Sequence, residues 1–203
     1  MSTEIKENLR TGLVIMASGL GKRFGGNKLI EPLEQKPLIK WIIDTTEGLF
    51  DKRIVVTRSE DVRELCKSLE IDHVFHSLPG RNDTVRLGLE ALMEEIDYCF
   101  FTPGDQPLIE RESICKLLDA AINNKDKIVR PFYGDFEGSP VGFPKCYFDN
   151  LLELPEGKGG NVIVKDTPES VLKIEVQNKH ELWDIDTVSD LEKIKNVLKN
   201  SIN

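Results

Sequence analysis

A glycine-rich, basic stretch is the part of the sequence best suited to holding a phosphate. It runs from Gly19 to Lys28 (GLGKRFGGNK) and directly follows an apolar segment. Glycine has no Cβ, so backbone N–H groups in such a loop can approach a phosphate closely. Between Glu7 and Glu31 the sequence has no acidic residue, although the whole chain carries a net charge of -8. This local positive charge predicts a site for a small polyanion.

Two well-known phosphate-binding loops do not match this stretch. The P-loop needs Ser or Thr after Gly-Lys, whereas Arg23 follows Lys22. The dinucleotide-binding fingerprint needs a third glycine at fixed spacing and an acid ending the second strand. Here Gly25 comes one place late and the second strand ends in Arg58. The remaining alternative to a phosphate loop is a basic surface turn without a ligand.

Acidic residues that follow predicted strands form a second candidate site. Asp105 comes soon after the apolar segment 98–102, and alternation places Asp184 and Asp186 on one side of the extended segment 183–186. Mg²⁺ is held in proteins by one or two carboxylates together with phosphate oxygens and waters. Asp105 therefore predicts a magnesium site, and Asp184 and Asp186 form a second acidic segment. The alternatives are a turn aspartate at 105 and, at 186, an acid favoured by the dipole of the following helix.

A third candidate is the start of a predicted helix in the segment 80–89 (GRNDTVRLGL). Hydroxyl and amide groups at a helix N-terminus can contact the edge of a base and a ribose. Ordinary N-terminal capping by Asp83 or Thr84 explains the same residues equally well.

These candidates must be positioned by alternating strands and helices. Short apolar or β-branched segments predict strands at 13–18, 53–57, 73–77, 98–102 and 127–130. Amphipathic spacing predicts helices at 37–50, 61–69, 84–95 and 111–123. Right-handed crossovers between such strands give a mostly parallel, Rossmann-like sheet, so we expect an α/β fold, a three-layer αβα sandwich. The loops after Ser18, Ser77 and Thr102 should then meet at one edge of the sheet.

The second part of the sequence is less regular. Residues 132–142 predict a loop or hairpin, residues 157–160 a loop followed by a short helix, and residues 171–176 a strand. Thr187 and Asp190 have the spacing of a capping box that opens a last helix. We expect one domain over 1–203, with a nucleotide-binding half (1–130) and an acceptor-side half (131–203).

Composition excludes several classes of protein. A chain of 203 residues, 39% apolar and 31% charged, fits one globular domain. Acids outnumber bases 35 to 27, which argues against binding nucleic acid. No apolar run is long enough to span a membrane or to form a secretory signal, so a cytoplasmic location is expected. The four cysteines contain no CxxC pair and are expected to be free thiols.

The stretch 14–39 resembles the signature loop of the MobA-like NTP transferase superfamily, and of molybdenum cofactor cytidylyltransferases in particular. The pattern GxxxRxGxxK, followed by Lys-Pro-Leu, is matched by Gly19, Arg23, Gly25 and Lys28 and by residues 36–38. The resemblance implies the fold of the nucleotide-diphospho-sugar transferases. It also implies that the loop holds the triphosphate of a nucleotide, with Arg23 and Lys28 neutralising its charge.

Later segments extend the resemblance over nearly the whole chain. Residues 104–107 (GDQP) are similar to the family's first metal aspartate, and residues 184–190 to the stretch with the second, at Asp186. The segment around Arg81 resembles the base-contacting loop, especially that of the cytidylyltransferase of isoprenoid synthesis. Residues 138–143 and 157–160 are similar to acceptor-side segments, but Ser139 stands where the family has histidine and Lys158 where it has aspartate.

The resemblance implies transfer of a nucleotide monophosphate from an NTP, CTP in the first place, to a phosphorylated acceptor such as molybdopterin, with release of pyrophosphate. Mg²⁺ is the expected cofactor, and Mn²⁺ a substitute. The expected catalytic residues are Arg23, Lys28 and Asp105, and the expected metal ligands are Asp105 and Asp186. The expected nucleotide-binding residues are Ala17, Ser18, Gly19, Leu20, Gly21, Lys22, Gly25, Arg81, Asp83, Thr84 and Gly104. The expected acceptor-binding residues are Gln106, Ser139, Pro140 and Gly159.

Three other functions stay open. The first is that of a guanylyltransferase for the same cofactor. The second is that of a nucleotidyltransferase for a sugar phosphate or a polyol phosphate. The third is a nucleotide-binding accessory protein without catalysis, partnered with a molybdoenzyme or its maturation factor, which the departures at Ser139 and Lys158 favour.

Overall fold

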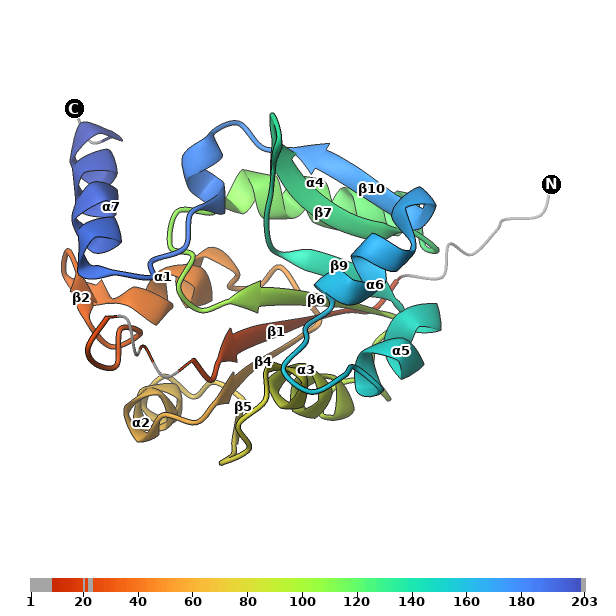
Figure 1. The fold of residues 1–203 in the computed structure, drawn as a ribbon, viewed down its shortest axis with the longest axis horizontal. Coiled ribbons are helices and arrows are strands. Elements are labelled where there is room, and N and C mark those ends of the chain that lie inside the picture. The colour runs from red at the N-terminus through yellow and green to blue at the C-terminus, as the bar shows by residue number, and fades with distance from the viewer. Residues whose placement is uncertain (1–8, 20, 22–23, 202–203) are drawn as a thin grey trace.

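The computed structural model describes residues 9–19, 21 and 24–201, which form one sheet of eight strands covered by helices on both faces (Figure 1). The strand order is β10-β7-β9-β6-β1-β4-β5, and β8 pairs with β7 outside this path. The strands of the sheet are β1 (Thr11–Ala17), β4 (Lys52–Thr57), β5 (His73–Phe75), β6 (Tyr98–Pro103), β7 (Ile128–Tyr133), β8 (Phe136–Glu137), β9 (Val141–Pro144) and β10 (Val171–Glu175). A separate two-stranded piece contains β2 (Pro32–Leu33) and β3 (Lys36–Pro37).

Most of the sheet is parallel, as expected. Strand β1 pairs in parallel with β4 and β6, β4 with β5, and β7 with β10. Ile15 in β1 lies opposite Val55 on one side and Thr102 on the other. The first five residues of β1 are all buried, which is typical of a parallel strand covered on both faces.

The helices form the two outer layers of the expected αβα sandwich. Leu13 and Ile15 belong to one core cluster with residues of α1, α2, α4 and α7, whereas Val14 belongs to a second with residues of α3, α5 and α6. This alternation along β1 is the two-residue period of a strand. The helices are α1 (Leu38–Thr45), α2 (Glu60–Ser68), α3 (Arg81–Glu90), α4 (Arg111–Asn123), α5 (Phe148–Leu152), α6 (Asn161–Asp166) and α7 (Val188–Ser201), with 3-10 turns at Lys145–Tyr147, Pro168–Ser170 and Lys179–Leu182.

Two helices differ in length from the predicted ones. The helix predicted over 37–50 ends at Thr45, and the chain then turns at Gly48, whose φ is +67°. The helix predicted over 84–95 begins three residues earlier, at Arg81, and ends at Glu90. The start of α7 is as predicted, because Thr187 N donates to Asp190 Oδ2 (3.0 Å) and Asp190 N to Thr187 Oγ1 (3.2 Å).

The region predicted as a loop or hairpin contains both a hairpin and a further strand. Strand β7 turns back into β8, and β9 then runs antiparallel to both β6 and β7. Val141, at the start of β9, pairs with Phe101, near the end of β6. An antiparallel strand starts where its neighbours end, so Ser139 enters the sheet at the same edge as the end of β6.

Candidate active site

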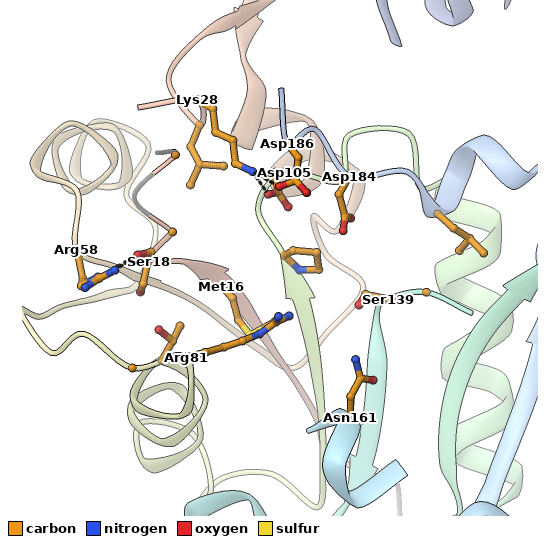
Figure 2. Close-up of a pocket in the computed structure, with 18 of the residues that line it drawn as sticks. Met16, Ser18, Lys28, Arg58, Arg81, Asp105, Ser139, Asn161, Asp184 and Asp186 are labelled. Atoms are coloured by element: carbon orange, nitrogen blue, oxygen red, sulfur yellow. Dashed lines mark hydrogen bonds and ion pairs between the residues drawn. The ribbon is translucent and has the colours of Figure 1, made fainter. Parts of the chain in front are cut away.

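A cavity of about 610 Å³ opens at the carboxyl ends of the parallel strands. The loops after β1, β5 and β6 meet there, as expected for an open α/β sheet. Ser18, Gly80 and Asp105 line the cavity from these three loops, and the segments around Ser139 and Asp184 complete its wall (Figure 2).

Lys28 lies at the centre of the charged part of this cavity. Its side chain is 9% exposed, and its Nζ is 2.5 Å from Asp105 Oδ2 and 3.4 Å from Asp186 Oδ1 (Figure 2). The same Nζ donates a hydrogen bond to the carbonyl oxygen of Ile185 at 2.6 Å. The last residue of the glycine loop is thus joined to both aspartates that the sequence predicts as metal ligands.

Three carboxylates gather around this lysine. Burial, followed by the charges of Asp105 and Asp186, raises the pKa of Asp184 to about 6. Asp105 Oδ1 is buried and has no hydrogen-bond partner within the described part of the chain. The concentration of carboxylates, together with an unpartnered carboxylate oxygen, is suited to binding a cation.

The described residues do not form a complete metal site by themselves. Among them, no three His, Cys, Asp or Glu side chains are arranged to hold a metal ion. Magnesium needs only one or two protein carboxylates, because phosphate oxygens and waters complete its coordination. The pair Asp105 and Asp186 fits that requirement.

The glycine loop follows β1 along the edge of the cavity, with Gly19 and Gly21 in its wall. Gly21 has a φ of +57°, and a Cβ there would overlap the carbonyl oxygen of Gly26, so the turn requires glycine. Gly25, with a φ of +86°, donates its N–H to the carbonyl of Gly21 at 3.1 Å. Leu20, Lys22 and Arg23 lie outside the described residues, and their roles stay predictions.

Ser18 is held from two sides at the start of this loop. Arg58 Nε and Nη2 donate to the Ser18 carbonyl at 2.9 and 2.8 Å, and Ser18 Oγ is 2.8 Å from His76 Nε2. Arg58 also lines the cavity, and the sequence had not predicted this. Ala17, in contrast, is buried in β1, where its carbonyl accepts a hydrogen bond from Thr57.

The start of α3 forms the wall opposite the acids. Gly80, Arg81 and Thr84 line the cavity there. Asp83 Oδ2 accepts a hydrogen bond from Gly80 N at 2.9 Å, and Asp83 Oδ1 lies 3.6 Å from Arg86. Asp83 therefore caps the helix, which was the alternative to a nucleotide contact.

Of the predicted acceptor residues, Ser139 lies in the cavity wall. Gln106 is buried instead, and its Nε2 donates to the carbonyls of Ser139 (2.9 Å) and Glu181 (2.6 Å). This side chain thus fixes the segment that carries Ser139. Gly104 also has a structural role, because its N–H donates a hydrogen bond to the carbonyl oxygen of Met16 at 3.0 Å.

A side chamber of about 290 Å³ adjoins the main cavity. Ser139 and Arg81 line both spaces, and Gly159 lines the chamber. Pro140, the next residue after Ser139, is not among the described residues that line the main cavity or the chamber. The floor of the chamber is largely apolar, and its charged lining residues are Arg81, Lys158 and Lys165.

Arg130 is a further cavity residue that was missed. It lies in β7, is 7% exposed, and lines the main cavity. The only available signal was a charged residue within a segment predicted to be a buried strand.

The structure carries no membrane-crossing element among the residues it describes, since none of their helices is both long and apolar enough.

Comparison with known proteins finds similar curated proteins. The chain is 28% identical over 204 residues to the bifunctional protein GlmU of Thermoanaerobacter pseudethanolicus, covering 93% of this chain and 40% of that protein. It is 31% identical over 123 residues to the 2-C-methyl-D-erythritol 4-phosphate cytidylyltransferase of Endomicrobium trichonymphae, covering 58% of this chain and 56% of that one. The chain thus spans about half the length of these curated relatives, or less.

Solved structures share the fold. Rv0371c from Mycobacterium tuberculosis H37Rv superimposes with a TM-score of 0.83 at 22% identity, over 93% of this chain and 99% of that chain. The same protein has also been crystallised as a complex with manganese, for which the TM-score is 0.75 at 19% identity, over 93% of this chain and 99% of that one. The family model of the MobA-like NTP transferase domain matches residues 13–171. With the glycine loop and the acids at the carboxyl edge of a mostly parallel sheet, the chain belongs to the family of MobA-like NTP transferase domains.

Proposed function

We propose that this chain is a nucleotidyltransferase, which moves a nucleoside monophosphate from an NTP to a phosphorylated small molecule and releases pyrophosphate. One observation carries the proposal: Lys28, at the end of the glycine loop, meets Asp105 and Asp186 at the mouth of one cavity. A cationic loop for a triphosphate thus adjoins carboxylates for a divalent cation. Membership of the family supports the same reaction.

The reaction needs positioning and charge stabilisation more than a protein nucleophile. A phosphate oxygen of the acceptor attacks the α-phosphorus of the NTP, and the bond from that phosphorus to the bridging oxygen of pyrophosphate breaks. Backbone N–H groups of the loop, with Lys28, would hold the β- and γ-phosphates and stabilise the charge on the departing pyrophosphate. We propose that Arg23, Lys22 and Leu20 belong to the same phosphate-binding loop.

Asp105 and Asp186 would hold a divalent cation, Mg²⁺ or Mn²⁺, beside the triphosphate. When bound, such an ion neutralises the charge that develops on phosphate oxygens. The manganese complex of Rv0371c is consistent with a divalent cation in a protein of this fold.

We further propose CTP as the nucleotide and molybdopterin as the acceptor. CTP is supported by the likeness to a curated cytidylyltransferase and by the sequence around Arg81. Molybdopterin is supported by the likeness of the glycine loop to that of molybdenum cofactor cytidylyltransferases. Residues 1–130 would bind the nucleotide and residues 131–203 the acceptor, with Ser139 and Gly159 on the acceptor side and Thr84 on the nucleotide side.

The test is a screen for pyrophosphate release. CTP, GTP, ATP and UTP would each be combined with molybdopterin, methylerythritol 4-phosphate, a hexosamine 1-phosphate and a polyol phosphate, with Mg²⁺ and with Mn²⁺. We expect turnover with CTP and molybdopterin. Turnover with GTP or with a sugar phosphate would replace the proposed substrate and keep the reaction, whereas nucleotide binding without pyrophosphate from any pair would refute the reaction itself.

A variant links the activity to the site. Asp105→Asn removes one charge at the cavity and is expected to lower turnover at least ~10²-fold, the scale for losing one electrostatic stabiliser. Asp119→Asn, which makes the same change on the exposed surface of α4, is the matched control and should leave turnover unchanged. Equal activity of the two variants would remove Asp105 from the mechanism.

A further inference from the structure

Arg130 is a buried cation in the wall of the main cavity that the proposed reaction does not use. The two residues before it in β7, Ile128 and Val129, are fully buried, and Arg130 itself is 7% exposed. Burial lowers the pKa of its guanidinium, but arginine stays protonated in proteins. Because a buried charge is costly unless it is paired, the partners of Arg130 decide what this position can do.

The pairing of Arg130 is incomplete. Its Nη1 lies 2.7 Å from Glu137 Oε2, and its Nη2 is 3.4 Å from the carbonyl oxygen of Gly138, which is a long hydrogen bond. Its Nε is buried and makes no hydrogen bond to any residue that the structure describes. The guanidinium therefore has donors left for a ligand.

Glu137 does not neutralise this wall. Its second carboxylate oxygen, Oε1, pairs with Lys173 from β10. Two cations thus share one carboxylate, and Arg130 and Lys173 against Glu137 alone leave one positive charge. Glu137 also lines the cavity and holds the arginine side chain in place, but because its charge is shared with Lys173 it offsets the charge of Arg130 only in part.

The position of Arg130 is on the side assigned to the acceptor. Gly138 and Ser139, which follow Glu137 directly, line the same cavity. Figure 2 shows Ser139 and Asn161 across the cavity from Ser18 and Arg58, which hold the start of the glycine loop. The charge of Arg130 is therefore separate from the phosphate-binding loop.

We propose that Arg130 binds an anionic group of the acceptor, a phosphate or a carboxylate, and so selects acceptors by charge. This inference rests on the proposed function, because it assigns one substrate of that reaction. Guanidinium groups bind both kinds of anion through paired N–H donors, and charge-assisted hydrogen bonds of this kind are stronger than neutral ones. Glu137 orients the guanidinium before the acceptor arrives.

The kinetic test measures the KM for the acceptor and the KM for the nucleotide in the wild type, in Arg130→Met and in Arg130→Lys. It uses the substrate pair found in the screen. Arg130→Met should raise the KM for the acceptor about 10–100-fold, the range for losing a hydrogen bond to a charged group, and leave the KM for the nucleotide within about twofold. Arg130→Lys, which keeps the charge, should recover part of the loss. Lys173→Met is the matched control, because it removes the other cation on Glu137 and does not line the cavity. An equal change in both KM values would refute a contact with the acceptor.

A second measurement requires neither catalytic turnover nor a variant that lacks the positive charge at position 130. The Nε–Hε NMR signal of Arg130, assigned by its loss in Arg130→Lys, would be followed while magnesium pyrophosphate saturates the glycine loop. Addition of inorganic phosphate, or of acetate in a separate titration, should shift this signal, and the anion that shifts it more identifies the class of group. A signal that neither anion moves would overturn the inference. Should the wild type release no pyrophosphate with any acceptor, the proposed function fails while this titration still decides whether Arg130 binds anions.

Discussion

Replacing Lys28 by methionine would remove the cation that pairs with the carboxylates of Asp105 and Asp186. Methionine keeps much of the length and the apolar stem of lysine but has no charge. In the variant Asp105, Asp184 and Asp186 would face one another without the ammonium group that lies 2.5 Å from Asp105 and 3.4 Å from Asp186. We therefore expect Lys28→Met to fold less stably and to bind divalent cations differently from the wild type.

The size of the effect follows from burial. Removing one partner of a fully buried ion pair costs about 3–5 kcal/mol. The side chain of Asp105 is 18% exposed and that of Asp186 is 44% exposed, so solvent screens part of the repulsion. A loss of about 2–3 kcal/mol is the expected result, and it corresponds to a fall in Tm of about 4–12 °C for a chain of this length.

Divalent cations should reverse much of this loss. In the wild type Lys28 competes with a metal for both aspartates, and the variant removes this competition. A cation at 100 times its Kd stabilises a protein by about 2.7 kcal/mol. The assay is thermal unfolding of both proteins with and without Mn²⁺, and Mn²⁺ should raise the Tm of Lys28→Met more than that of the wild type.

The control is Lys40→Met, which removes a lysine paired with Asp44 at 2.6 Å on the surface of α1. A half-exposed pair of this kind contributes about 0–1 kcal/mol, and Mn²⁺ should not affect the two proteins differently. The reasoning is wrong if Lys28→Met is as stable as Lys40→Met, or if Mn²⁺ stabilises the wild type and Lys28→Met equally.

Three further changes test other parts of the structure. Gly88→Ala would place a Cβ 2.9 Å from Cγ2 of Val14, and closer still to Cγ1, where α3 packs on the sheet; urea unfolding should show a loss of about 1–3 kcal/mol. Gln106→Leu would leave two buried carbonyl groups without their donor, and should cost about 1–3 kcal/mol and raise the KM for the acceptor more than that for the nucleotide. Burial, with the nearby charge of Arg58, lowers the pKa of His76 below its usual 6.5. As the pH falls, the unfolded chain therefore binds a proton at His76 before the folded chain does. The stability due to His76 is present above pH 6.5 and falls as the pH drops below it, by at most about 1.4 kcal/mol per pH unit. His76→Asn should show a flatter dependence of the free energy of unfolding on pH between pH 6.5 and 5.

Much of the structure of residues 1–130 could be predicted because its signals are local. An apolar run before Gly19 is enough to predict a buried parallel strand that ends in a loop. The absence of acids around Lys28 shows where positive charge gathers without any knowledge of the fold. Parallel topology then brings Asp105 to the same edge, which is why the two could be placed together before the structure was known.

The parts that could not be predicted depend on contacts between distant segments. Arg130 lines the cavity only because β7 lies where it does, and its partner Glu137 is shared with Lys173 of another strand. Asp83 has a residue type and position that suit both a cap and a ligand; its 2.9 Å contact with Gly80 N shows that it caps the helix, and its contact with a nucleotide stays a prediction. Strand β9 was missed since its sequence, VGFP, contains two residues that usually weaken strands.

The glycine in that strand limits how the segment around Ser139 can change. A Cβ at Gly142 would lie 2.5 Å from Cε1 of Phe100 and 2.6 Å from Cε1 of Tyr98, so the two rings of β6 pack directly on the backbone of β9. A change of register that moved another residue into the place of Gly142 would bring a side chain onto these rings. This stretch therefore tolerates a change of backbone position poorly, whereas the hairpin tip around Gly134 and the loop around Gly157, where a Cβ would meet open space, have room for a change of length.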